Sequence, residues 1–343
     1  MESEILKDEN EWNNYIKLKI NATVYHTLEW KKVMEEFGHK PYYILCKEKG
    51  EVKGVIPIFY VGGIFGKRLV SVSLRDRGGP LFDNENVLTS LMNKVIELCK
   101  SLRCDYIEIK SISNIPLIKS KGFIEKKELI GTKIPLTNNI DEIWKSMDKS
   151  SVRSSIKKAV KIGIKCRWSK ELKDLNEFYN LFVKTRKKLG VPPYSYSFFK
   201  SMMEKMKDIF KLIVAEYEGK IISAAIIFAY NKTLIDAYAA SNEKFLNLRP
   251  NNGIVWETIK LGVRERFETF DFGADYPSCK GLIAFKSRWG GIQKNTYSYF
   301  YLNNIKKIPT FGIAENILIK KIWQLMPIGL SKILGRYMTK QVS

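Results

Sequence analysis

The sequence contains 343 residues, of which 45% are apolar and 12% aromatic, so it is long enough for two packed cores and too apolar for a disordered chain. Its formal net charge of +22 indicates a polyanionic partner, such as phosphate groups, RNA or an anionic membrane surface. No stretch approaches the roughly 18 apolar residues of a spanning helix. The acidic start MESEILKDENEW differs from a secretion signal, so we expect a cytoplasmic location.

The cysteines and histidines exclude several kinds of site. The five cysteines are scattered without a CxxC pair, which argues against a disulfide framework and a zinc ribbon. Only two histidines occur, His26 and His39, so a histidine-rich metal site is excluded and no metal ion is expected. A Ser-His-Asp triad would have to use one of these two residues, which lie far along the chain from most other candidate polar groups.

An internal repeat organises the chain. One copy, YYILCKEKGEVKGVIPIFY, covers residues 42–60, and the other, FKLIVAEYEGKIISAAIIFAY, covers residues 210–230. Each copy predicts two apolar strands joined by a hairpin, with the turn centred on Gly50 in the first copy and on Gly219 in the second. Glycine suits both turns because they need a positive φ.

Similar elements follow the two hairpins. A third strand, a helix and a short fourth strand are predicted over residues 68–74, 85–102 and 106–109 in the first half and over 234–240, 252–267 and 269–272 in the second. We therefore predict an α/β (α+β) protein made of two copies of one mixed fold, each with a mostly antiparallel sheet flanked by helices. The expected domains are residues 1–138 and 139–305, because turn residues separate them near Pro135.

A basic helix opens the second half. Apolar residues recur at helical spacing over residues 152–162, and Gly163 marks the expected end. Arg153, Lys157 and Lys161 lie four residues apart, and like charges at this spacing repel each other by about 0.2–0.5 kcal/mol. Such a column indicates that Arg153 and Lys157 bind an anionic substrate. A helix whose charged side faces solvent gives the same pattern.

The segment LRPNNG, residues 248–253, leads into the next predicted helix. Asn251 or Asn252 caps that helix, and the N–H groups of the loop then face a phosphate with the help of the helix dipole. Arg249 supplies a positive charge beside the loop. Arg249 and Asn252 are therefore candidate substrate-binding residues, although asparagine caps many helices without binding any ligand.

Candidate catalytic groups gather in FDFGADYPSCKGLIAFKSRWGG, residues 270–291. A predicted strand ends there and is followed by a polar loop with Asp275 and Tyr276, and then by Lys286. A lysine ammonium stabilises a developing oxyanion or holds a phosphate, so Lys286 is the first candidate catalytic residue. The letters DFG also occur in kinases, but the glycine-rich and HRD-type loops of kinases are absent from this sequence.

The surroundings of Lys286 come from FKSRWGG, residues 285–291. Phe285 and Trp289 are expected to fix the backbone and exclude water, and the two glycines to let a substrate approach closely. Trp289 is therefore counted as a candidate substrate contact. Both aromatic residues also fit core positions.

The loop RDRGGP, residues 75–80, follows the third strand of the first half. Its two glycines permit a tight backbone, and Arg75 and Arg77 flank Asp76. Arg77 is a candidate substrate-binding residue in this loop. A structural turn with one ion pair is the alternative.

Residues 306–343 form a basic C-terminal tail. Apolar residues recur at helical spacing from Ile317 to Met338, with Pro327 as an expected kink, and basic residues surround them. The last 41 residues hold seven Lys or Arg against Glu315 alone. A basic amphipathic helix of this kind either lies in a membrane interface or packs on its own domain, and both alternatives stay open.

Together these motifs resemble the Fem family of peptidoglycan-bridge aminoacyl transferases and the wider Fem-like branch of the Gcn5-related (GNAT) acyltransferases. The resemblance implies two tandem GNAT-like domains, in agreement with the repeat, and extends to about Leu302. It implies that Lys286 lies in the channel for the activated acyl end, and that Arg153 and Lys157 belong to a basic helix at the domain junction. Tyr194 is a further candidate substrate contact. The matching segments are HTLEW (26–30), RDRGGP (75–80), SSVRSSIKKAVKIG (150–163), RKKLGVPPYSYSFF (186–199), FDFG (270–273) and FKSRWGG (285–291).

The resemblance implies an acyltransferase that moves an aminoacyl or acyl group from aminoacyl-tRNA or acyl-CoA to an amine of a cell-envelope precursor, without a permanently bound cofactor. Because the donor is already activated, the site needs only to orient the amine, remove a proton and stabilise the oxyanion. Asp275, Tyr276 or Glu108 relays the proton. The expected partners are a phosphate-bearing envelope precursor, charged tRNA and, through the tail, the inner membrane surface.

Two alternatives stay open. The first is an acyl-CoA-dependent N-acetyltransferase unrelated to the cell wall, in which residues 248–253 cradle the pyrophosphate. The second is a non-catalytic, basic RNA- or membrane-binding adaptor on a degenerate fold. The adaptor predicts no saturable binding of an acyl donor, so binding of coenzyme A or charged tRNA discriminates between these functions.

Overall fold

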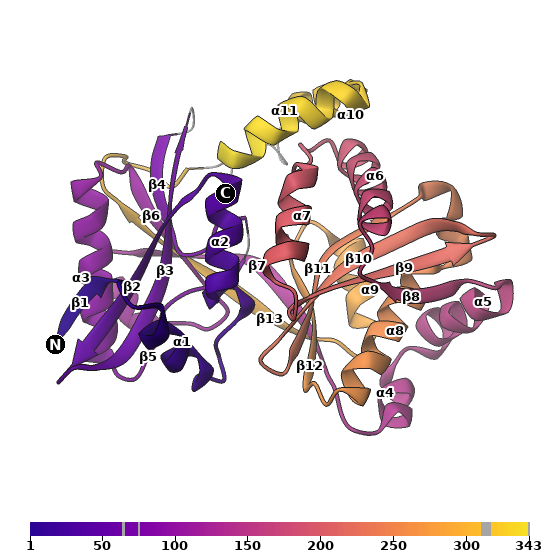
Figure 1. Ribbon diagram of the computed structural model, residues 1–343, viewed down its shortest axis with the longest axis horizontal. Coiled ribbons are helices and arrows are strands. Elements are labelled where there is room, and N and C mark those ends of the chain that lie inside the picture. Colours follow the sequence, from indigo (N-terminus) through magenta and orange to yellow (C-terminus); the bar gives the residue numbers. More distant parts are fainter. Residues whose placement is uncertain (64–65, 75, 310–316, 342–343) are drawn as a thin grey trace. The chain divides into compact units, whose positions relative to one another are not determined.

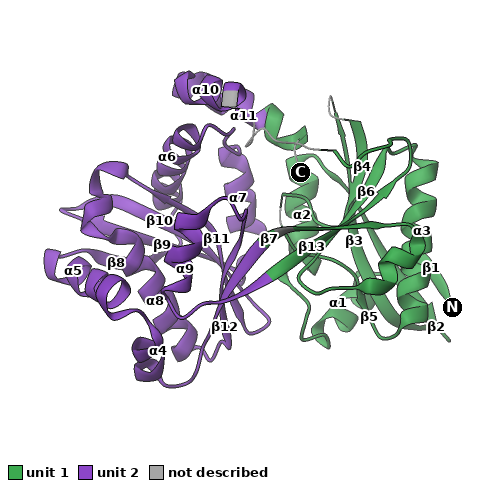
Figure 2. Cartoon of the chain, turned by 180° about the vertical axis from the view of Figure 1, so that it is seen from behind, with its two compact units in different colours: residues 1–129, 295–311, 337–343 green, residues 130–294, 312–336 purple. Residues whose placement is uncertain are grey.

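A computed structural model describes residues 1–63, 66–74, 76–309 and 317–341 of the chain (Figure 1). The chain forms two compact units, shown in green and purple in Figure 2. Unit 1 comprises Met1–Leu129, Asn295–Phe311 and Tyr337–Ser343, and unit 2 comprises Ile130–Lys294 and Gly312–Arg336. Each unit has its own hydrophobic core, which is the usual mark of a domain.

Unit 1 is a mixed sheet with helices on both faces. Its strands are hydrogen-bonded in the order β1-β2-β3-β4-β6-β13, and β5 pairs with β3. The strands are β1 (Glu2–Ile5), β2 (Lys40–Glu48), β3 (Glu51–Gly63), β4 (Gly66–Val70), β5 (Leu81–Phe82), β6 (Tyr106–Ser111), the first part of β7 (Ile124–Pro135) and most of β13 (Ile292–Leu302). The helices are α1 (Glu9–Lys17), α2 (Leu28–Phe37) and α3 (Glu85–Ser101), with 3-10 turns η1 (Val24–His26) and η2 (Pro116–Lys121).

The alternation of side chains along β2 explains this layering. Ile44 and Cys46 point into the core cluster that includes Val87 and Leu91 of α3. Tyr43 points to the other face, where its ring lies 4.4 Å from the ring of Trp12 on α1. Because successive side chains of a strand face opposite sides, one apolar strand can bury two helical layers.

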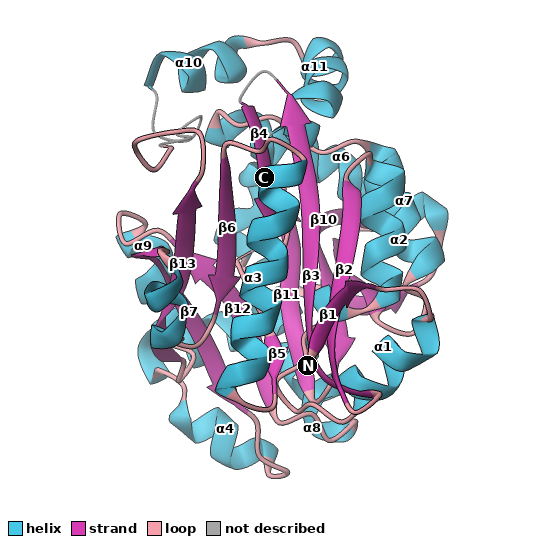
Figure 3. Cartoon of the chain, turned by 90° about the vertical axis from the view of Figure 1, so that its left-hand side faces the viewer, coloured by secondary structure: helices cyan, strands magenta, loops and turns pink. Residues whose placement is uncertain are grey.

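Unit 2 repeats this plan. Its strand order is β7-β12-β11-β10-β9-β8, with the second part of β7, β8 (Lys165–Ser169), β9 (Phe210–Tyr217), β10 (Lys220–Tyr230), β11 (Thr233–Ser241) and β12 (Thr269–Asp275). Figure 3 distinguishes the helices from the strands. The helices are α4 (Ile140–Ser146), α5 (Ser154–Ile162), α6 (Leu172–Leu189), α7 (Tyr196–Lys205), α8 (Pro250–Arg264), α9 (Lys280–Ser287), α10 (Ile317–Leu325) and most of α11 (Ile328–Gln341), with η3 (Lys149–Arg153) and η4 (Glu243–Leu248).

Both predicted hairpins are present, between β2 and β3 and between β9 and β10. Their turns contain Lys49 and Gly50 in the first unit, and Glu218 and Gly219 in the second, all four with positive φ. Two consecutive residues with positive φ are typical of the tight turns that match the twist of a hairpin. Antiparallel pairing predominates, and β4–β6 and β11–β12 are parallel pairs, so the predicted fold class is confirmed.

The compact units differ from the expected domain ranges at β13 and in the tail. β13 begins in unit 2, but its residues Tyr297–Leu302 pair with β6, so Asn295–Phe311 group with unit 1. The tail is divided as well, because Tyr337–Ser343 group with unit 1. Residues 310–316 and 342–343 of the predicted tail lie outside the described residues.

Candidate functional site

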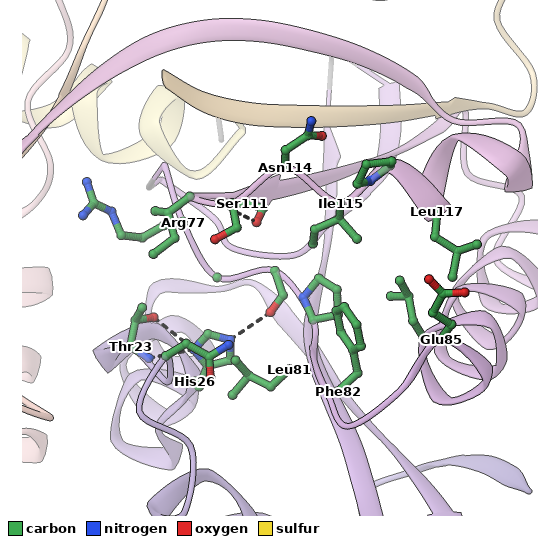
Figure 4. A pocket seen from close by; sticks show the side chains of 18 residues that line it. Thr23, His26, Arg77, Leu81, Phe82, Glu85, Ser111, Asn114, Ile115 and Leu117 are labelled. Carbon is green, nitrogen blue, oxygen red and sulfur yellow. Dashed lines mark hydrogen bonds between the residues drawn. The ribbon is translucent and has the colours of Figure 1, made fainter. Parts of the chain in front are cut away.

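A cavity of about 340 Å³ lies in unit 1, beside the ends of its parallel strands β4 and β6 (Figure 4). Its walls come from the loop after β4, from the loop after β6, from η1 and from the start of α3. Ligands of α/β sheets bind at such carboxyl ends of parallel strands, and the volume suits a small molecule or one arm of a larger one. The lining residues include Thr23, His26, Arg77, Gly79, Glu85, Ser111, Asn114 and Ile115.

Arg77 lies at one end of this cavity and Glu85 at the other (Figure 4). The Arg77 side chain is only 3% exposed, and its Nε donates a hydrogen bond of 3.1 Å to Asp76. This ion pair orients the guanidinium. The sequence-predicted residue Arg77 therefore lines a cavity, whereas its neighbour Arg75 lies outside the described residues.

His26 fixes the floor of the cavity and was not predicted as a site residue. Its Nδ1 accepts a hydrogen bond of 3.1 Å from the backbone N–H of Thr23, so the proton of the neutral ring is on Nε2. Nε2 then donates to the carbonyl of Gly79 at 2.8 Å. Burial lowers the pKa of His26 to about 4, so the ring is neutral at pH 7 and acts as a structural clamp. The sequence segment that contains His26, HTLEW, contributed to the family resemblance but did not indicate a role for this histidine.

In unit 2, Lys286 and Asp275 form an ion pair between α9 and the end of β12. The Lys286 ammonium donates to Asp275 at 2.6 Å and to the carbonyl of Phe272 at 2.8 Å. The two side chains are 9% and 10% exposed. An ammonium has three N–H donors, so these two contacts leave one donor for a ligand. Sequence reasoning named both residues separately, and the fold brings them into direct contact.

Tyr276 and Trp289, the other candidates of this segment, lie in different environments. Tyr276 directly follows Asp275 in the chain. Its side chain is 50% exposed, so its ring is accessible to solvent. Trp289 is fully buried, and its ring packs 6.4 Å from Phe272 and 6.2 Å from Phe285. A fully buried side chain has no surface for a substrate, so Trp289 acts through packing.

The two glycines after Trp289 also serve packing. A Cβ on Gly291 would lie 2.9 Å from the carbonyl oxygen of Lys286 and 2.5 Å from Thr132. A Cβ on Gly290 would lie 2.9 Å from Ser146, and this residue has a φ of +80°. These glycines permit close approach of the chain's own segments, whereas the sequence had suggested approach of a substrate.

The parallel strands of unit 2 separate next to helix α8. β11 and β12 pair from Thr233↔Thr269 to Ile235↔Asp271, although β11 continues to Ser241. Asn251, in the first turn of α8, accepts hydrogen bonds from Ser223 at 2.7 Å and Ser241 at 2.6 Å, so it ties this turn to β10 and β11. This is the unit 2 counterpart of the strand ends that line the cavity of unit 1.

Several backbone N–H groups in the first turn of α8 already form hydrogen bonds within the protein. Those of Asn252 and Gly253 point to the Arg249 carbonyl at 3.1 and 3.4 Å, and Pro250 has none to offer. The side chain of Asn252 is buried, while Arg249 is exposed and adopts a left-handed φ of 66°. Of the two predicted residues, Arg249 is thus the accessible one.

The remaining predicted residues lie elsewhere in unit 2. Arg153 ends the five-residue π turn η3 and is half-buried, whereas Lys157 on α5 is exposed. Arg153 has right-handed helical backbone angles and directly precedes α5, which carries Lys157 and Lys161. Tyr194 lies in an aromatic cluster, 6.0 Å from Phe182 and 5.6 Å from the Arg186 guanidinium.

Glu108, the third candidate proton relay, belongs to unit 1. It lies on β6, is 7% exposed, and pairs with Lys110 at 3.7 Å and with Ser298 at 3.4 Å. Within the described ranges, no group of three or more His, Cys, Asp or Glu side chains is arranged to hold a metal ion.

Residues 148–286 match the family model of the acetyltransferase (GNAT) domain. No curated protein matches the chain in sequence. The solved structures provide likeness of fold. FemX superposes with a TM-score of 0.74 at 18% identity, over 89% of this chain and 98% of FemX.

Two other similar structures have lower scores. One is the C-terminal domain of a putative lysylphosphatidylglycerol synthetase from Agrobacterium fabrum, with a TM-score of 0.59, 10% identity, and coverage of 85% of this chain and 91% of that one. The other is a tandem GNAT protein from the clavulanic acid biosynthesis pathway, with a TM-score of 0.58, 9% identity, and coverage of 88% and 98%. The chain is an acyltransferase with a GNAT domain in unit 2, and it shares its fold with FemX and with tandem GNAT proteins.

Proposed function

We propose that this acyltransferase moves an aminoacyl or acyl group from an activated donor to an amine of a phosphate-bearing cell-envelope precursor, and that the donor is aminoacyl-tRNA. The observation that carries this proposal is the cavity of unit 1, whose lining includes Glu85 and Arg77 with its ion pair to Asp76. A phosphate complements Arg77, and an amine-bearing arm of the same molecule complements Glu85 at the other end.

The fold likeness to FemX and to a lysylphosphatidylglycerol synthetase supports this choice of substrates. Fem-family transferases, which the sequence resembles, move an amino acid from aminoacyl-tRNA to an amine of a cell-wall precursor. The name of the synthetase refers to a lysyl group on a membrane phospholipid. The net charge of +22 also suits a phosphate-rich donor such as tRNA.

The reaction needs little covalent help from the protein. The amine nitrogen attacks the ester carbonyl of the donor, an amide C–N bond forms, and the ester C–O bond to the ribose breaks. The amine loses a proton, and the ribose oxygen takes one as it leaves. We assign stabilisation of the intermediate oxyanion to the third N–H of Lys286 and proton transfer to Asp275 or Tyr276.

The start of α8 favours tRNA over coenzyme A as the donor. A pyrophosphate at a helix N-terminus needs backbone N–H groups that point at it. Here Asn252 and Gly253 direct theirs at the Arg249 carbonyl, and Pro250 lacks one. The match to a GNAT domain supports the second candidate, an acyl-CoA-dependent N-acyltransferase.

Parallel transfer assays with the two donors separate the two candidate functions. The full chain is incubated with a nucleotide-linked peptidoglycan precursor and with either radiolabelled aminoacyl-tRNA or radiolabelled acetyl-CoA. We expect label in the precursor from charged tRNA only. Transfer from acetyl-CoA alone would support the second candidate and overturn the choice of donor. Absence of transfer to the precursor from both donors would overturn the choice of acceptor.

A further inference from the structure

The helices α10 and α11 carry large apolar side chains on their outer surface. Ile322 and Leu325 of α10 are 58% and 82% exposed, and Leu330, Ile333 and Leu334 of α11 are 46%, 60% and 38% exposed. We call these five residues the tail face. Large aliphatic side chains concentrated on two consecutive short helices are unusual for a surface in contact with water only.

The opposite sides of both helices hold them against unit 2. On α10, Trp323 is 4% exposed, and the neighbouring Gln324 donates a hydrogen bond of 2.9 Å to the carbonyl of Lys188 at the end of α6. On α11, Ser331 is fully buried, and a Cβ on Gly335 would lie 2.5 Å from the backbone of Pro193. The inner side is therefore already used by the protein itself.

This pattern is the reverse of an ordinary surface helix. Ser331 and Gly335 lie four residues apart on the inner side of α11, while Leu330, Ile333 and Leu334 face outward. A helix that served only to cover its own domain would turn its large apolar residues inward and its small polar residues outward. The tail face therefore fits an apolar environment outside the chain.

The charges around the tail face identify that environment. The described tail residues 317–341 contain five Lys or Arg and no Asp or Glu. Lys321 and Arg336 are exposed, whereas the Lys332 ammonium lies 5.2 Å over the ring of Tyr179. Apolar side chains bordered by cations complement a bilayer with anionic headgroups. A second copy of this chain is a poorer partner, because it brings the same positive charges.

The lengths of the helices set the mode of contact. α10 has 9 residues and α11 has 14. Among the helices in the described ranges, none has both the length and the apolar character to cross a membrane. Short helices with one apolar face and cationic borders lie in the plane of the membrane interface.

We propose that the tail face docks the protein on an anionic membrane surface, with α10 and α11 lying in the interface. The apolar side chains enter the boundary between headgroups and acyl chains, and the exposed cations Lys321 and Arg336 contact the anionic headgroups. This inference rests on the exposed residues and charges of the tail and does not depend on which acceptor the enzyme uses.

Cosedimentation of the full chain with lipid vesicles tests the proposal. The vesicles contain 30% phosphatidylglycerol in phosphatidylcholine, and pure phosphatidylcholine vesicles serve as the comparison. We expect binding to the anionic vesicles that weakens as salt is added. The double variant Leu325→Ser/Ile333→Ser should bind at least about ten-fold more weakly, because apolar area no longer enters the interface. Lys321→Gln/Arg336→Gln should lose a similar factor through the lost headgroup attraction.

Matched variants keep the test specific. Leu18→Ser/Ile20→Ser removes two aliphatic side chains that are 83% and 81% exposed in unit 1, and it should bind like the unchanged protein. All variants should keep the melting temperature, because the replaced side chains are exposed. Transfer to a soluble precursor should also be unchanged in Leu325→Ser/Ile333→Ser, which separates this proposal from the proposed function.

Three results would overturn the proposal. One is absence of binding to the anionic vesicles. Another is equal binding by Leu325→Ser/Ile333→Ser and the unchanged protein, which would mean that net charge alone attracts the vesicles. The third is a dimer in solution that Leu325→Ser/Ile333→Ser dissociates, which would assign the tail face to a second copy of the chain.

Discussion

The ammonium group of Lys286 lies 2.6 Å from a carboxylate oxygen of Asp275, and both side chains are about nine-tenths buried. Removing one partner of a buried ion pair leaves the other charge without compensation. Lys286→Ala should therefore lower the free energy of unfolding by roughly 3–5 kcal/mol. Urea denaturation of Lys286→Ala and of the unchanged protein measures the difference in their free energies of unfolding.

A second variant separates the catalytic role of Lys286 from its structural role. Lys286→Met/Asp275→Asn removes both charges and should recover much of the stability that Lys286→Ala loses. If Lys286 stabilises the oxyanion, transfer by the double variant should stay roughly 100-fold or more below that of the unchanged enzyme. Recovery of transfer together with stability would make this pair purely structural.

Arg77 tests the assignment of the acceptor to the cavity of unit 1. A charge-assisted hydrogen bond contributes about 1.5–3 kcal/mol, so Arg77→Met should raise the KM for the precursor by roughly ten-fold or more. The KM for the donor should not change. Arg103→Met, an exposed arginine of the same unit, is the control and should leave both constants unchanged. An equal rise of both KM values for Arg77→Met would point to general distortion of the protein.

Local features of the fold were predictable from the sequence. The hairpins at Gly50 and Gly219 depend on residues that are neighbours in the chain, and the repeat showed that both halves follow the same plan. Helix ends such as Gly163 were predictable for the same reason, because a left-handed φ at the helix end favours glycine. Lys286 and Asp275 were named as candidates from residue type and position in one short segment.

Long-range features were not predictable from the sequence. The cavity of unit 1 combines Thr23, Arg77 and Ser111, which come from three separate segments of the chain. β13 pairs with β6, and the partners Phe300 and Glu108 are almost two hundred residues apart in the chain. Periodicity reports whether a segment is buried, but it does not report which distant segment covers it.

Gly79 provides a test of how tightly the cavity loop is packed. A Cβ on this residue would lie 2.9 Å from the carbonyl oxygen of Lys110, which belongs to the backbone and cannot easily move. Gly79→Ala should therefore destabilise unit 1 by roughly 1–3 kcal/mol and weaken binding of the precursor. Gly281→Ala is the matched control, because a Cβ there meets nothing within 4 Å. Equal melting temperatures for the two variants would contradict the close packing of the loop.

Two buried histidines should make the protein sensitive to mild acid. Burial lowers the pKa of His26 to about 4, and burial, with the nearby positive charges of Arg68 and Lys340, lowers the pKa of His39 to about 4. In the unfolded chain a histidine titrates near about 6.5. Between these values the unfolded state binds more protons than the folded state, so stability is complete above about pH 6.5 and falls as the pH decreases toward 4.

The size of this effect can be measured one histidine at a time. Each ring should contribute a loss of roughly 2 kcal/mol in the free energy of unfolding between pH 7 and pH 5. His39→Leu removes the titrating group beside the Lys340 carbonyl, which accepts its Nε2–H bond at 2.8 Å. The variant starts from a lower stability, but its loss between pH 7 and pH 5 should be about 2 kcal/mol smaller than that of the unchanged protein. Denaturant titrations at the two pH values give both losses. Equal losses in the two proteins would mean that His39 titrates normally in the folded state, so its ring would have to be open to water.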